Sequence, residues 1–146
     1  MFESRTITSA DAIMQLVALG VYDSPQRIQG FSTDNMWTSD AKQTAEFQMG
    51  ADGKLSAGFV FAPTRISVTL QADSESIDFF DQVAQVEQQK KKKIEIRGVV
   101  TIPGIRKKFA LQKFYMENWQ PLPGAGRVLA PRPFALVGES CTWARM

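Results

Sequence analysis

The side chains that most often carry out catalysis or bind metals are scarce in this sequence. None of the 146 residues is a histidine, and Cys141 is the one cysteine. A Ser-His-Asp or Cys-His pair therefore cannot form, and a conventional zinc site lacks its usual ligands. Cys141 lies in an apolar run, so we interpret it as a small buried hydrophobe. These residue types predict a protein that is not an enzyme and needs no cofactor.

The acidic and glycine-containing segments do not change that prediction. Four carboxylates fall close together, but they lack the alternating spacing of a calcium loop, so we assign them to a helix start and to solubility. Neither glycine stretch, 50–53 or 124–126, leads into a helix with a Lys-Ser/Thr signature, so neither is a phosphate-binding loop. The four carboxylates are Asp73, Glu75, Asp78 and Asp81.

The strongest charge feature is a run of four lysines, Lys90, Lys91, Lys92 and Lys93. We favour a solvated helix end, because cations there complement the helix dipole. The alternative is a basic surface that meets nucleic acid or an acidic partner. A second basic cluster, at 106–108, is expected at the opposite end of a strand pair. The net charge of +2, from 17 basic and 15 acidic residues, is too even to indicate nucleic acid by itself.

Most of the chain alternates between apolar and polar residues, which is the period of a β-strand. The Asp52-Gly53 pair is the strongest hairpin signal. Asp23-Ser24-Pro25 predicts another turn, and a loss of register near Lys113 predicts a β-bulge. Pro103-Gly104 predicts a third turn. Seven or eight strands are expected, within 12–19, 26–31, 44–49, 54–61, 64–71, 94–102, 107–118 and 133–143.

One segment, 74–91, has the period of an α-helix. Ile77, Phe80, Val83 and Glu87 recur at helical spacing, and the lysine run follows the last turn. Asp73 or Ser74 is the expected N-cap, since short polar side chains accept hydrogen bonds from the first turn. The pattern therefore predicts a sandwich or barrel of strands with a single flanking helix, built as one domain over 1–146.

Composition places the chain among ordinary globular proteins, with 44% apolar and 22% charged residues. No stretch is apolar enough to cross a membrane, and the N-terminus lacks a secretory layout, which predicts an intracellular product and no membrane partner. Several large hydrophobic residues nevertheless fall at loops, termini or strand ends. They either fold back on the core or contact a neighbouring subunit. The candidate interface residues are Met36, Trp37, Phe61, Phe79, Trp119 and Trp143, with Phe2 beside them.

Five segments of the chain form a recognisable set: Leu-Gln-Ala-Asp-Ser-Glu-Ser-Ile-Asp-Phe-Phe at 70–80, Gln-Met-Gly-Ala-Asp-Gly-Lys-Leu-Ser-Ala-Gly at 48–58, Gly-Val-Val-Thr-Ile-Pro at 98–103, Lys-Lys-Phe-Ala-Leu at 107–111 and Val-Leu-Ala-Pro-Arg-Pro-Phe at 128–134. Taken together, they resemble small tail proteins of tailed bacteriophages. The likeness spans residues 6–140. The layout is similar to tail-tube and baseplate-hub proteins of contractile-tailed phages. A fibre would show long repeats or heptads, and this chain shows neither.

The resemblance implies a tail-tube-like β-sandwich or barrel that assembles with itself into a ring, a hexamer by analogy. It also implies contacts with other tail or baseplate proteins, a channel that DNA passes through, and a place in the virion tail after assembly in the host cytoplasm. The segment 32–53 is the expected extension toward an adjacent ring. A nucleic-acid-binding β-barrel that uses Lys90–Lys93 is the alternative function.

Overall fold

The computed structural model describes residues 11–32 and 36–146. Within these ranges the chain forms nine strands, one α-helix and a 3-10 turn, which confirms a mainly β protein with one helix. The expected strand number was low because the three-residue β3 is too short to show alternation. The strands are β1 (Ile13–Ala18), β2 (Tyr22–Ile28), β3 (Trp37–Ser39), β4 (Ala45–Met49), β5 (Leu55–Phe59), β6 (Thr64–Leu70), β7 (Ile96–Ile102), β8 (Lys107–Asn118) and β9 (Arg132–Arg145); α1 spans Ile77–Lys90 and η1 spans Pro103–Ile105.

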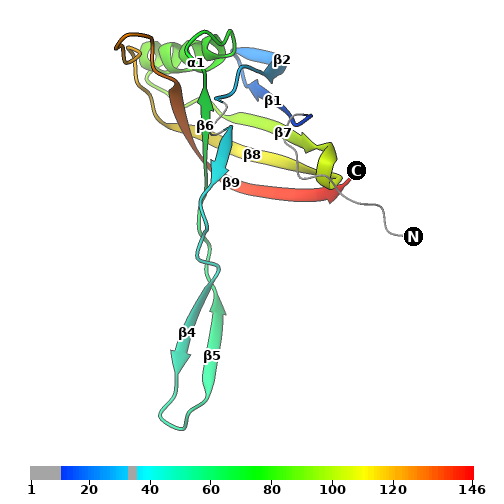
Figure 1. Cartoon of the computed structure of the whole chain (residues 1–146). Coiled ribbons are helices and arrows are strands. Elements are labelled where there is room, and N and C mark those ends of the chain that lie inside the picture. The colour runs from blue at the N-terminus through cyan, green and yellow to red at the C-terminus, as the bar shows by residue number, and fades with distance from the viewer. Residues whose placement is uncertain (1–10, 33–35) are drawn as a thin grey trace, which may run out of the picture.

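Seven strands form one antiparallel sheet in the order β2-β1-β7-β8-β9-β6-β3. The two edge strands do not pair with each other, so the described part of the chain is an open sheet and not a closed barrel. Figure 1 shows α1 lying along one side of this sheet, at the end farthest from the β4-β5 ribbon. The layering of a curved sheet and a flanking helix agrees with the predicted sandwich-like fold.

β9 links the two halves of the sheet, and Figure 1 shows it bending partway along its length. Its pairing with β6 ends at Gly138, which marks the corner. Residues 132–138 pair with β6, whereas residues 135–145 pair with β8 on the other side. A Cβ atom at Gly138 would lie 2.4 Å from the ring of the fully buried Phe114, so only glycine fits there. Beyond this corner, residues 139–145 keep β8 on one edge and have no described strand on the other.

The helix α1 supplies the centre of the core. Phe80 stacks on Phe134 of β9 at 4.4 Å between ring centroids, and Phe79 lies 5.1 Å from Tyr22 of β2. The predicted N-caps Asp73 and Ser74 are wrong, because the helix begins at Ile77 and its N-cap is Ser76.

The serine hydroxyls at the start of α1 bind the neighbouring strand instead of capping the helix. Ser76 Oγ accepts a hydrogen bond from the Gln29 amide at 2.8 Å, and Ser74 Oγ donates to the Gln29 carbonyl. The start of α1 is therefore attached to the end of β2.

The first hairpin turns earlier than predicted. β1 and β2 pair antiparallel, but the turn lies at residues 19–21, and Asp23-Ser24-Pro25 falls inside β2. Gly20, with φ of 84°, supplies the left-handed conformation, and its amide donates to Asp23 Oδ1. The turn therefore forms at Gly20, and not at Asp23-Ser24-Pro25 as the sequence predicted.

The predicted bulge near Lys113 is confirmed. Lys113 has φ of 56°, and the β7-β8 register slips by one residue between Leu111 and Phe114. Both of these side chains are buried, so the extra residue keeps two apolar runs on the core face.

The β4-β5 ribbon continues the β3-β6 pair outward as one long hairpin. Ser39 pairs with Ile66, the Asp40 amide donates to the Arg65 carbonyl, and Ala45 pairs with Phe59. We call residues 40–63 the arm; Figure 1 shows it projecting well beyond the sheet. The predicted extension at 32–53 has the wrong bounds, because it includes β3 of the main sheet and omits the returning strand β5. The Asp52-Gly53 hairpin itself is confirmed.

Candidate assembly interface

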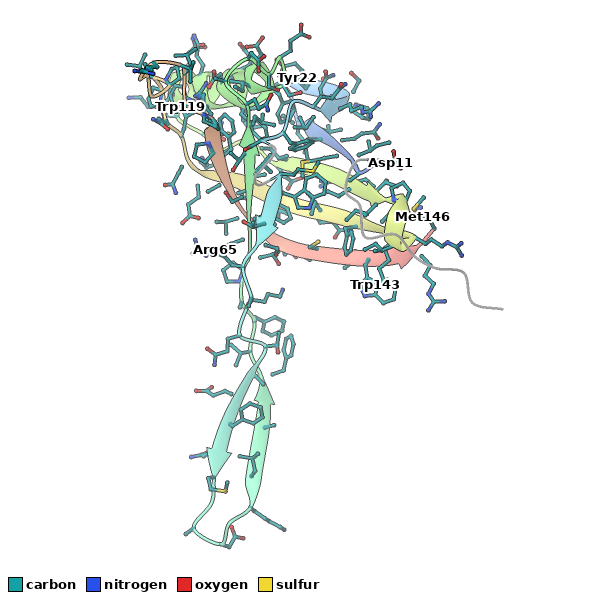
Figure 2. All side chains as sticks on the ribbon, viewed as in Figure 1. Asp11, Tyr22, Arg65, Trp119, Trp143 and Met146 are labelled. Carbon is teal, nitrogen blue, oxygen red and sulfur yellow. The ribbon has the colours of Figure 1, made fainter. Side chains whose placement is uncertain are left out.

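One face of the arm is apolar, and among the described residues its one ring contact, Phe59 with Phe61 at 4.9 Å, lies within the arm itself. Cross-strand pairing puts six side chains on that face, while the other face carries Glu46, Gln48, Ser56 and Gly58. The four largest apolar side chains are between 59% and 73% exposed. Figure 2 shows the arm's side chains standing free of the rest of the molecule. The apolar face consists of Ala45, Phe47, Met49, Leu55, Ala57 and Phe59.

An isolated two-stranded ribbon has little to stabilise it in water. At least three strands, or a packed layer, are normally needed. Each leg of the arm from residue 40 to the tip has about a dozen residues, so the arm is roughly 40 Å long at ~3.3 Å per residue. A ribbon of this length with a solvated apolar face is typical of a segment that packs against another subunit.

The free edge of β9 at residues 139–145 is a second candidate surface. A cross-strand row begins at the buried residues Met14 and Val100, continues through the half-buried Phe109, and ends at Trp143, which is 58% exposed. The row leaves the core at a strand edge that has no partner strand among residues 11–32 and 36–146. A strand from a neighbouring subunit could pair with the backbone of this edge and cover Trp143 at the same time.

The opposite edge of the sheet is partly blocked against strand addition. Pro25 lacks an N–H group and lies where the β1-β2 register is irregular. Just beyond β2, the amide and carbonyl of Gln29 are occupied by Ser76 and Ser74. Proline and irregular pairing are common protections of edge strands. Of these two edges, the β9 edge at 139–145 is therefore more accessible to an added strand than the β2 edge.

The six predicted interface residues fall into different environments. Phe61 is 90% exposed at the base of the arm, and Trp143 is exposed on β9. Phe79 is only 3% exposed because it packs in the core under β2, so it has no surface to offer a partner and its prediction is wrong. Phe2 lies outside the described residues.

The remaining three are half-buried within the subunit. Trp37 packs edge-on against Phe31 at 5.2 Å, and the Met36 carbonyl accepts a hydrogen bond from the Thr69 amide. Trp119 donates its indole N–H to Asp81 at 3.0 Å. Trp37 and Trp119 therefore stabilise the subunit through their side chains, and Met36 does so through its backbone carbonyl.

The structure divides the lysine run. Lys93 Nζ donates to the buried Glu87 carboxylate at 2.7 Å and to the Met116 carbonyl at 2.8 Å. Lys91 adopts the left-handed conformation that ends α1. All four lysines are exposed, including Lys93, whose side chain is 55% exposed despite these hydrogen bonds. The cluster at 106–108 lies at the other end of β8, which is the separation that the sequence predicted.

A further apolar surface lies on the segment 119–131, which we call the proline loop. Leu122 and Val128 are 78% and 80% exposed, and Leu129 is exposed beside them. The loop is nevertheless folded on itself, because the Ala130 amide donates to the Gly124 carbonyl at 2.9 Å and the Gly126 amide donates to the Val128 carbonyl at 3.1 Å. Its apolar side chains therefore face solvent from an ordered backbone.

Asp81 of α1 fastens both ends of the proline loop. The almost fully buried Arg132 forms a two-armed ion pair with Asp81 at 2.8 and 2.9 Å, and also donates to the Gln120 carbonyl at 2.6 Å. Burial raises the pKa of Asp81, but the hydrogen bonds from Arg132 and Trp119 outweigh burial and hold that pKa below its ordinary value. Asp81 therefore stays ionised at neutral pH.

Cys141 is exposed, so the prediction of a buried hydrophobe is wrong. β9 runs past the part of the sheet that α1 covers, and Cys141 lies on that extension. Partial burial still raises the pKa of its thiol, although the charge of Lys42 opposes the effect. The thiol is therefore mostly protonated at neutral pH.

Sequence reasoning named Phe61 of the arm but missed the other apolar residues of the arm and those of the proline loop. The alternation in 44–49 predicted a strand within the extension, without assigning Phe47 or Met49 to an interface. One signal for the loop was available: large aliphatic side chains placed among proline and glycine, where a core strand cannot form.

Among residues 11–32 and 36–146, no three acidic or cysteine side chains gather where they could hold a metal ion. None of the described helices is long and apolar enough to span a membrane.

The fold is shared with chains from contractile injection systems. One belongs to the extended sheath-tube complex of the PVC extracellular contractile injection system: TM-score 0.61, 10% identity, covering 91% of this chain and 88% of that chain. A chain of the anti-feeding prophage baseplate has a TM-score of 0.58 at 10% identity and 98% coverage of both chains. A chain of the anti-feeding prophage cap, which terminates its tube, has a TM-score of 0.57 at 9% identity, covering 100% and 95%. At 9–10% identity, these likenesses show that the overall fold is shared.

The sequence itself places the chain in a family. Residues 5–142 match the model of the family described as tail fiber protein gp32, and the chain belongs to that family. It is a phage-tail-type structural protein. Among curated proteins, none matches the sequence significantly.

Proposed function

We propose that the protein is a ring subunit of a contractile phage tail, acting as a tube-like or baseplate-hub component. The observation that carries this proposal is the arm, a long ribbon whose apolar face has, among the described residues, its one ring contact within the arm itself. A subunit that functions alone gains nothing from such a face, whereas a subunit in an assembly uses it to hold its neighbours. The contractile-system fold supports the same function.

The ring itself would form through the free edge of β9. Strand addition at 139–145 would pair the open backbone groups and cover Trp143. A contact between unlike surfaces that closes on itself gives a ring, and a hexamer is the number expected from tube-like proteins. DNA would pass through the channel, and the assembled protein would reside in the virion tail.

The family description names a tail fibre, and the described residues favour a different arrangement. A fibre shaft is built from long repeats or coiled-coil heptads. Here the chain is an open sheet with one helix of 14 residues. These features support a ring component over a shaft.

The nucleic-acid alternative receives less support. Lys93 is engaged by Glu87 and Met116, and the two basic clusters lie at opposite ends of β8. A filter-binding titration across salt tests it, since phosphate contacts would produce a steep loss of affinity with added salt.

The test of the ring uses purified protein and one exposed aromatic. We expect the wild-type chain to form a ring by light scattering and electron microscopy, and Trp143→Ser to reduce ring formation by about tenfold, or ~1.4 kcal/mol per contact. Val99→Ser is the matched control, because Val99 is exposed but lies on the opposite sheet face. A chain that stays monomeric at high concentration and is absent from assembled tails would refute the proposal.

A further inference from the structure

The arm and the proline loop lie at opposite ends of the molecule. In Figure 1 the arm projects from the lower end of the sheet, and the loop lies at the upper end beside α1. The hydrogen bonds of Trp119 and Arg132 to Asp81 fix the loop against α1. When copies are stacked along the direction of the arm, the arm of one copy therefore meets the loop end of the next.

The two surfaces resemble each other in being apolar and exposed. The arm offers Phe47 and Phe59, and the loop offers Leu122, Val128 and Leu129. The loop is pre-ordered by its own backbone hydrogen bonds and by the buried Arg132, so little conformational entropy is lost when a partner docks. It therefore presents a rigid apolar platform to the arm's side chains.

The net charges of the two segments differ in sign. The arm carries Asp40, Glu46 and Asp52 against Lys42 and Lys54, whereas the proline loop carries Arg127 and no carboxylate. The exposed Lys90, Lys91 and Lys92 add positive charge nearby, because the end of α1 is held against β8 by the hydrogen bond from Lys93 to Met116. Opposite charges around apolar contacts favour one docking orientation.

We propose that the proline loop is the receiving surface for the arm of a second copy, so that the chain carries both halves of an axial contact. Such a head-to-tail contact does not close on itself, and it stacks rings into a tube of many layers. The inference rests on the proposed ring function and extends it by naming the partner of the arm. A subunit of a single baseplate ring would instead offer its arm to a different protein.

Cysteine cross-linking tests the contact in the full-length chain. In a Cys141→Ser background, Phe47→Cys and Val128→Cys proteins are prepared separately, mixed, and treated with a short bismaleimide. We expect a cross-linked pair in at least about tenfold higher yield than for the controls, because docked groups have effective concentrations near millimolar. The controls are Gln48→Cys, on the opposite face of the same strand, and Gln85→Cys, exposed on α1.

Substitution supplies an independent measurement. The triple variant Leu122→Ser, Val128→Ser, Leu129→Ser should retain rings by light scattering but lose stacks in electron micrographs, as should Phe47→Ser with Phe59→Ser. Circular dichroism checks that both variants fold, which is expected because the altered side chains are exposed.

The outcomes separate the two proposals. Normal stacking of the loop variant, together with no Phe47–Val128 product above the controls, would overturn the axial contact and leave the ring proposal standing. Protein that forms neither rings nor stacks, and gives no cross-link, would overturn both.

Discussion

Asp81 joins three segments that are far apart in the sequence. It accepts hydrogen bonds from Trp119 at the end of β8 and from Arg132 at the start of β9, while itself belonging to α1. Arg132 is almost fully buried, and its Nε has no hydrogen-bond partner among the described groups. The guanidinium therefore depends strongly on Asp81 to balance its charge.

Replacing Asp81 should destabilise the subunit. Asp81→Asn leaves the buried Arg132 without a counter-charge, and we expect a loss of about 2–4 kcal/mol in the free energy of unfolding, measured by urea titration. Asp78→Asn, on an exposed position of the same helix, should cost about 0.5 kcal/mol. The double variant Asp81→Leu, Arg132→Met should recover part of the loss. Equal effects of both asparagine variants would contradict this role.

The same ion pair predicts an acid-dependent stability. Because the pKa of Asp81 is lower in the folded chain, the carboxylate stabilises the fold above the unfolded value of about 3.9 and loses this effect as pH falls through its folded pKa. The advantage of wild type over Asp81→Asn should therefore be constant near neutrality and shrink below about pH 4. Urea midpoints at a series of pH values measure it, and a gap that persists unchanged to pH 2 would refute the assignment.

At the scale of elements, the corner in β9 decides how the sheet is divided. One strand serves β6 with its first half and β8 with most of its length, and the change occurs where Gly138 lies against Phe114. Beyond this corner, residues 139–145 pair with β8 on one edge and with no described strand on the other. The proposed ring contact therefore depends on a glycine that does not itself touch a partner.

A side chain at Gly138 should damage the corner. The added Cβ of Gly138→Ala would lie 2.4–2.6 Å from three ring atoms of Phe114, so Phe114 must move, and we expect a cost of about 1–3 kcal/mol by thermal or urea unfolding. Gly58→Ala in the arm is the control, since the added Cβ would lie an ordinary 3.9 Å from the Glu46 carbonyl oxygen. If the two alanine variants unfold alike, the tight packing at the corner is refuted.

At the scale of the whole molecule, the chain combines a packed body with a segment that lacks a core. The body encloses Phe80, Phe114 and Phe134 between α1 and the sheet, whereas the arm has one layer and two strands. Local stability should therefore be unequal, high in the body and low in the arm.

The arm should become protected only on assembly. In the dissociated subunit we expect fast amide exchange and early proteolytic cleavage within 44–60, with little protection in the ribbon and strong protection in β7 and β8. In assembled tails, exchange in the arm should slow by at least about tenfold, since partner contacts add free energy to the closed state. Hydrogen-exchange mass spectrometry compares the two states. An arm equally protected in both would mean that it needs no partner.

The elements with a strong local signal were predictable from the sequence. The alternation of 64–71, the Asp52-Gly53 hairpin, the lost register at Lys113 and the period of the helix each follow from a few neighbouring residues. The N-cap and the first turn were misplaced because serine, aspartate and proline suit several nearby positions, and tertiary contacts chose among them: Gln29 bound the hydroxyls of Ser74 and Ser76.

The interface was less predictable for a related reason. Apolar alternation indicates that one face of a strand is buried. It does not indicate whether that face packs against the same chain or against another subunit. Val68 and Phe47 both lie in strictly alternating segments, yet Val68 is buried in the core and Phe47 projects on the arm.

The sequence by itself determined a mainly β chain with one helix, and its lack of histidine excludes a Ser-His-Asp or Cys-His site. These properties depend on local periodicity and on residue types. Only the tertiary structure decided which apolar side chains stay exposed, that residues 139–145 have a free edge, and that the arm and the proline loop lie at opposite ends. Long-range pairing sets those features, because the direction in which β9 leaves its corner and the length of the ribbon beyond β6 follow from contacts between distant segments.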